Sequence, residues 1–72
     1  MEREVQIRDE TIRLGQLLKL VGAIDSGSEA KSFLELESVL VNGERETRRG
    51  RQLRRGDTIR VGEQQMKVAN TD

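Results

Sequence analysis

The 72-residue chain has no cysteine and no histidine, and it also lacks proline, tryptophan and tyrosine. Without cysteine, neither disulfide bonds nor thiolate metal sites can form. The absence of histidine removes the most frequent general base and the most frequent metal ligand in proteins. No cluster of paired carboxylates takes their place. We therefore expect no catalytic residues, no metal site and no cofactor.

Long hydrophobic runs are missing as well. The longest apolar stretches span only a few residues, so no transmembrane helix is expected. The first residues show no secretory signal, which makes a cytoplasmic location without a membrane partner the expectation. Charged residues make up 36% of the chain and apolar ones 33%, but the apolar residues are patterned, which favours a fold over disorder. We expect one domain over residues 1–72.

The apolar pattern predicts two helices. One covers residues of about 12–21 and ends at Gly22, and the other covers about 28–37. Ser26 followed three residues later by Glu29 fits a capping box before the second helix. Their apolar faces consist of Leu14, Leu17, Leu18, Val21, Ala30, Phe33 and Leu34. Because the connection is short, the helices should pack against each other.

The remaining sequence predicts strands. Alternation favours a strand over about 4–8, and Asn42-Gly43 is a strong hairpin signal with a return strand of about 44–48. Residues 70–72 should fray. The other alternating pairs are Val39 and Val41, Ile59 and Val61, and Met66 and Val68. The predicted fold is α+β, with two packed helices on a small, mostly antiparallel sheet.

The zero net charge hides an uneven distribution of charge. Residues 45–60 contain no lysine and only two acids, Glu46 and Asp57, among many arginines. These are Arg45, Arg48, Arg49, Arg51, Arg54, Arg55 and Arg60. Leu53 is an apolar anchor inside the run, and strand signals flank it, so we expect a folded surface and not a tail. Such a run can be a solvated face, but arginine's planar fork matches phosphate oxygens, which favours a polyanion.

The composition narrows the choice of polyanion. Phe33 is the single aromatic residue and is expected in the core, so no stacking platform for unpaired bases is predicted. The second helix carries Glu35 and Glu37, which makes it a poor helix for a DNA groove. The sequence contains no basic amphipathic helix, so an anionic membrane is not indicated as the partner. Recognition of structured RNA through phosphates and shape fits best.

Four segments together resemble a known family. They are Arg13-Leu14 at a helix start, SGSEAK at 26–31, VLVNGE at 39–44, and RRGD at 54–57 followed by TIRV. The combination resembles the S-four-type RNA-binding domain, or alpha-L motif, over about residues 11–61. It is most similar to bacterial stand-alone members, in which a GETETRR-like run follows the hairpin turn.

The resemblance implies an RNA-facing surface made by the two helices and the hairpin. Carried onto this chain, that surface includes Ser26, Gly27, Ser28, Lys31, Asn42, Gly43, Arg45, Arg48, Arg49 and Arg51. From their charge we add Arg13, Arg54 and Arg55. Many members have an arginine where Gly27 stands, and more cations along the second helix. This departure shifts the expected binding onto the arginine run.

We therefore predict a non-catalytic module that binds structured RNA, ribosomal or transfer RNA, as a monomer or within a ribosomal particle. The alternative is a protein-interaction or assembly module that docks on a larger ribonucleoprotein through its acidic first half and basic second half. A sulfur carrier is not expected, because such proteins need a Gly-Gly C-terminus and this sequence ends in Thr71-Asp72.

Overall fold

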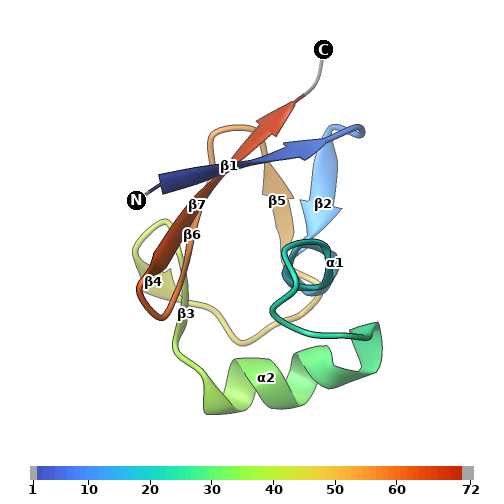
Figure 1. Cartoon of the computed structure of the whole chain (residues 1–72), viewed down its shortest axis with the longest axis vertical. Coiled ribbons are helices and arrows are strands. Elements are labelled where there is room, and N and C mark those ends of the chain that lie inside the picture. Colours follow the sequence, from blue (N-terminus) through green and yellow to red (C-terminus); the bar gives the residue numbers. More distant parts are fainter. Residues whose placement is uncertain (1, 71–72) are drawn as a thin grey trace.

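The computed structural model describes residues 2–70. Figure 1 shows the elements in chain order. They are β1 (Glu2–Ile7), β2 (Thr11–Arg13), α1 (Leu14–Leu20), the 3-10 turn η1 (Gly27–Glu29), α2 (Ala30–Leu36), β3 (Val39–Val41), β4 (Glu44–Arg45), β5 (Gln52–Arg54), β6 (Thr58–Val61) and β7 (Gln64–Asn70).

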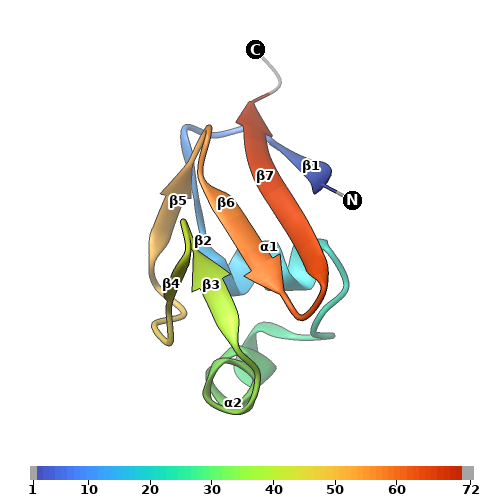
Figure 2. The same cartoon turned by 90° about the vertical axis from the view of Figure 1, so that its left-hand side faces the viewer.

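The strands form two sheets. The larger has the order β1-β7-β6-β3-β4, in which the β1–β7 pair is parallel and the other pairs are antiparallel. The smaller pairs β2 with β5. Figure 2 looks onto the five-stranded sheet, with α1 behind it and α2 at its lower end. The predicted α+β fold with a mostly antiparallel sheet is confirmed, but the sheet is larger than expected: it has five strands, with β1 at its edge beside β7.

The core lies between the larger sheet, α1 and the β2–β5 pair. Strand alternation turns Val5 and Val68 inward from adjacent strands, while α1 contributes leucines at helical spacing. The most deeply buried side chains are Leu14, Leu17, Leu18, Leu34, Leu53, Ile59, Met66, Val39 and Val68. Leu53 is completely buried, so its prediction as an apolar anchor is correct.

The first helix is shorter than predicted. It covers Leu14–Leu20, because residues 11–13 are extended and pair with β5, placing Ile12 opposite Leu53. The predicted loop around Leu53 therefore contains a strand. The end of the helix is as predicted, since Gly22 has a φ of 81° and its N–H donates to the carbonyl of Lys19.

The second helix also begins later than predicted. A 3-10 turn occupies Gly27–Glu29, and α2 starts at Ala30. The Ser26–Glu29 capping box is wrong: the Ser26 and Ser28 hydroxyls bond each other at 2.9 Å, and the Glu29 carboxylate lies 3.5 Å from the Asp25 nitrogen. The two hydroxyls satisfy each other and leave the backbone uncapped.

The apolar face of α2 is narrower than expected. Ala30 and Leu34 are buried, whereas Phe33 is only half-buried at the edge of the core.

The Asn42-Gly43 hairpin is confirmed. Both residues have positive φ, 53° and 86°, as a type I′ turn requires. The return strand ends at Arg45, and not at residue 48, although the Glu46 N–H still donates to the Val39 carbonyl at 2.9 Å. At the other end, Asn70 belongs to β7, and the predicted fraying of residues 71–72 lies outside the described residues.

Replacing Leu53 with alanine tests the role of β5 in the core. We expect the free energy of unfolding to fall by about 2–5 kcal/mol, because the side chain is fully buried and leaves a cavity. Urea denaturation followed by circular dichroism measures the loss. Gln52→Ala, at an exposed position of the same strand, should change it by less than about 0.5 kcal/mol. Equal effects of the two substitutions would contradict this role.

Candidate nucleic-acid interface

The segment between β4 and β5, residues 46–51, is here called the arginine loop. Its backbone docks on the start of α1: the Arg51 carbonyl accepts from the Leu14 N–H at 2.8 Å, and the Arg49 carbonyl accepts from the Gly15 N–H at 2.9 Å. The loop thereby satisfies two of the N–H groups that a helix leaves unpaired at its first turn. In Figure 1 this yellow segment passes between α1 and α2.

Gly15 lies where the loop and the two helices meet. A Cβ at this position would lie 3.4 Å from the Arg49 carbonyl oxygen and 3.4 Å from the Ala30 Cβ. These are ordinary van der Waals distances, so the start of α1 lies beside both neighbours. The arginine loop is therefore held beside the starts of both helices.

The carboxylate of Glu46 organises the arginine loop from within. The residue is 6% exposed. Its Oε2 accepts from the backbone N–H groups of Thr47 and Arg48, each at 3.0 Å, and from the Arg48 Nε at 3.1 Å. Its Oε1 accepts from Arg48 Nη2 at 3.1 Å and from Arg51 Nη1 at 2.9 Å. The Arg48 contact is thus bidentate, the strongest form of arginine–carboxylate pairing.

These bonds keep Glu46 ionised. The side-chain hydrogen bond from Arg48, followed by its backbone N–H and by Arg51, lowers the Glu46 pKa from 4.5 to about 2, although burial opposes the change. The same pairing raises the pKa of Arg48. The ion pairs therefore persist throughout the neutral pH range.

The arginines of the loop are not equivalent. Arg51 has a side chain that is 36% exposed and is bonded to Glu46, while the paired Arg48 side chain is 75% exposed. Arg49 is exposed, and its side chain makes no hydrogen bond or ion pair with the rest of residues 2–70. Arg49 is therefore the loop cation that can bind a partner without first losing an internal contact.

A shallow hollow of about 290 Å³ joins the three segments. Its lining residues are Arg13, Gly15, Gln16, Gly27, Ala30, Arg49 and Gly50. The structure thus brings predicted site residues from the first helix start, the second helix start and the arginine run to one place. Gly27 leaves open space, since nothing lies within 4 Å of where its Cβ would be.

Other predicted site residues lie along α2 and before it. Lys31 is exposed on α2, one residue after Ala30, and Arg45 donates from Nη2 to the Glu35 carbonyl at 3.3 Å, near the end of α2. Ser26 and Ser28 bond each other beside Gly27. The name basic surface is used below for Arg13, Lys31, Arg45, Arg48 and Arg49.

Arg54 and Arg55 do not join the basic surface. Along the β2–β5 pair, Arg54 lies opposite Thr11, while Arg13 lies opposite Gln52. Arg54 and Arg55 line a separate hollow with Glu10, Thr11 and Asn70. Because a strand advances about 3.3 Å per residue, β5 carries them away from the arginine loop. The six arginines between residues 45 and 55 lie in one run of the sequence, but the fold divides them.

The polar residues of two predicted turns have structural partners. Asn42 donates from Nδ2 to Asp57 Oδ1 at 3.1 Å and accepts the Thr58 N–H at 3.0 Å. Asp57 accepts the Arg54 N–H at 2.9 Å. These bonds join the hairpin turn to the turn before β6, in agreement with the interpretation of both segments as turns.

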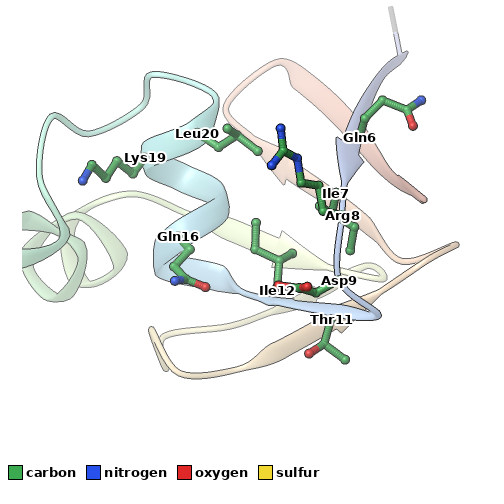
Figure 3. A pocket seen from close by; sticks show the side chains of 9 residues that line it. All are labelled: Gln6, Ile7, Arg8, Asp9, Thr11, Ile12, Gln16, Lys19 and Leu20. Carbon is green, nitrogen blue, oxygen red and sulfur yellow. The ribbon is translucent and has the colours of Figure 1, made fainter. Parts of the chain in front are cut away.

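A larger hollow, of about 700 Å³, lies elsewhere. Figure 3 shows the side chains that line it between the end of β1 and α1. Ile7, Ile12 and Leu20 supply its apolar side chains, and Arg8 and Lys19 carry positive charge there. Leu20 is 57% exposed. Nothing in the sequence analysis pointed to this hollow.

Glu46 is the site residue that the sequence analysis missed. It was counted only as one of two acids in the arginine run. Its position directly after the hairpin, followed by arginines two and five residues later, was the available signal.

Within residues 2–70, no group of side chains suited to a metal ion is present. No helix in that range is long and apolar enough to cross a membrane.

Comparison with known proteins gives two similarities. A protein-family model described as "S4 domain" matches residues 5–69. The chain is also 48% identical over 61 residues to the "probable ribosome maturation protein RlbA" of Bacillus subtilis (strain 168). The aligned residues cover 85% of this chain and 86% of that protein. Both similarities include the helices, the hairpin and the arginine loop.

Replacing Glu46 with glutamine tests its structural role. We expect the free energy of unfolding at pH 7 to fall by about 1–3 kcal/mol, because charged hydrogen bonds are lost and buried groups lose a partner. The Glu46 pKa is lower in the folded state, so its contribution is complete above pH 4.5 and disappears as the pH falls toward 2. In thermal melts from pH 7 to pH 2, the melting temperature of the variant should therefore fall less than that of the unaltered protein.

Glu44→Gln is the matched control, because Glu44 is exposed on β4 in the same hairpin. Its acid profile should follow that of the unaltered protein. An unchanged profile for Glu46→Gln would contradict the assignment.

Proposed function

Because this chain belongs to the S4-domain family, the family of S-four-type RNA-binding domains, we propose that it is a non-catalytic module that binds structured RNA through its arginine loop. The similarity to a protein named as a probable ribosome maturation protein supports ribosomal RNA, or transfer RNA at the ribosome, as the target. The proposed role is in ribosome maturation, as a cytoplasmic monomer that associates with a ribosomal particle.

The observation that carries the proposal is the meeting of three segments at one hollow. Arg13 from the start of α1 and Arg49 from the arginine loop line it together with Gly27. Two guanidinium groups from distant parts of the sequence can bind phosphates of a folded RNA in which the backbone approaches from two sides. Binding of a single-stranded RNA would not require cations from two separate segments of the protein.

The mode of binding follows from the side chains present. Phe33, the single aromatic residue, is half-buried against the core, so stacking on unpaired bases is not expected. The basic surface supplies arginine forks and one lysine, which suit phosphate oxygens. Contacts to phosphates and to the overall RNA shape are therefore proposed.

The members of the arginine run have different proposed roles. Arg49, Arg13 and Arg45 are the principal phosphate ligands, and Lys31 adds a point charge. Arg48 and Arg51 contribute through their pairing with Glu46. The RNA backbone approaches the protein beside the start of α2, at Ser26, Gly27 and Ser28. Arg54 and Arg55 form a separate contact for a neighbouring part of the RNA.

Protein contact is the second candidate, and one observation favours it. The hollow in Figure 3 combines apolar side chains with Arg8 and Lys19, and Leu20 is exposed there. A ribosomal protein could contact the domain at this place while RNA occupies the basic surface. Association with ribosomal particles that survives nuclease treatment would favour this candidate.

Replacing Arg49 with alanine tests the proposed interface. A charged hydrogen bond contributes about 1.5–3 kcal/mol, so affinity for a labelled ribosomal RNA fragment should fall by about tenfold or more. The slope of log affinity against log salt, about −3 to −5 for four to six phosphates, should become shallower by about 0.7–0.9. Fluorescence anisotropy over a salt series measures both quantities.

Arg60→Ala is the matched control. Arg60 is exposed on β6, and its Nε donates to the Gly62 carbonyl at 3.1 Å. Its removal should change affinity by less than about threefold, because it lies outside the basic surface. A salt-independent affinity, or equal losses for the two variants, would contradict the proposal.

A further inference from the structure

Glu46 is an acid buried inside the most basic segment of the chain. If the arginine run served only to attract phosphate, a carboxylate at its centre would weaken it. Yet this carboxylate is 6% exposed and accepts five hydrogen bonds, all from residues 47, 48 and 51. Its partners are the backbone and side chains of the arginine loop itself, so its effect is to fix the conformation of that loop.

The rest of the arginine loop has few other restraints. The Arg51 N–H donates to the Arg48 carbonyl at 3.2 Å, and the carbonyls of Arg49 and Arg51 dock on α1. Gly50 has nothing within 4 Å of where a Cβ would be, and Arg49 and Gly50 are exposed. Without the Glu46 carboxylate, the side chains of Arg48 and Arg51 lose the contacts that fix their directions.

A fixed and a mobile arginine loop differ in what they bind. Mobile cations can follow any phosphate chain, which gives affinity that depends on charge and little on shape. Cations held at set positions lose less conformational entropy on binding a matching RNA, and they fit other RNAs poorly. The internal carboxylate also reduces the net charge of the loop, which lowers its affinity for unmatched phosphate chains.

We propose that Glu46 is a positioning residue that makes the basic surface selective for folded RNA over an arbitrary phosphate chain. The proposal rests on the proposed RNA-binding function and concerns the selectivity of that same site. The bidentate contact holds the Arg48 guanidinium at the Glu46 carboxylate, and the second contact holds Arg51 at the same group. Arg49 is left between them as the free cation.

The experiment compares two RNA probes of equal length. One is a ribosomal RNA hairpin with an internal loop, and the other is single-stranded oligouridylate, so the numbers of phosphates are equal. For the unaltered protein, the hairpin should bind more tightly. In Glu46→Gln, the ratio of the two affinities should fall by about tenfold, which corresponds to about 1.4 kcal/mol, and oligouridylate binding should tighten.

The same variant should also respond more strongly to salt. Loss of one negative charge beside the arginines should steepen the slope for oligouridylate by about 0.7, the value for one single-strand phosphate contact. Glu44→Gln removes the same charge from an exposed position of the same hairpin. This control can strengthen binding to both probes, but it should leave their affinity ratio unchanged.

Arg48→Lys provides an independent test if Glu46→Gln folds poorly. Its side chain is 75% exposed, so the substitution should leave the fold intact. Lysine keeps the positive charge but cannot form the bidentate contact with Glu46. We expect a fall of about threefold or more in the affinity ratio with an unchanged salt slope. A residue that acted only through its charge would show no change.

The outcomes separate this inference from the proposed function. If Arg49→Ala weakens hairpin binding but Glu46→Gln and Arg48→Lys retain the original ratio, the inference is wrong and the function stands. Equal affinities of the unaltered protein for both probes would also overturn the inference. If the unaltered protein binds neither probe at low salt, the proposed function itself is wrong.

Discussion

The carboxylate of Glu46 is the group that holds the side chains of Arg48 and Arg51 in the arginine loop. Arginines that lie close together repel one another unless part of their charge is neutralised. Five hydrogen bonds to one buried carboxylate close the loop and leave Arg49 exposed and unpaired within the described chain. One acidic residue thus turns a charged segment into a surface with defined geometry.

The fold supports this arrangement through the backbone. Pairing of β2 with β5 fixes the strand after the arginine loop, and the Arg49 and Arg51 carbonyls dock on the first turn of α1. Gly15 lies where α1, α2 and the loop meet. These contacts connect the core around Leu53 directly to the cations, so a change in the core should alter the interface as well.

Much of the fold could be predicted because it depends on local patterns. The Asn42-Gly43 turn, the end of α1 at Gly22 and the buried Leu53 follow from backbone preference and alternation. The β2–β5 pair could not be predicted, because three-residue strands carry little pattern and their partners are distant in sequence. The same limit applies to the basic surface. The charge of the run was evident, but only the fold separates Arg54 from Arg49 and buries Glu46.

RNA is proposed to bind where the arginine loop meets the starts of the two helices. Titration of a ribosomal RNA fragment into nitrogen-15-labelled protein, followed by amide chemical-shift changes, locates the contact surface. This binding position predicts the largest changes within residues 13–16, 27–31 and 45–51. Changes centred on residues 6–8 and 19–20, which line the hollow in Figure 3, with an unaffected arginine loop, would contradict it.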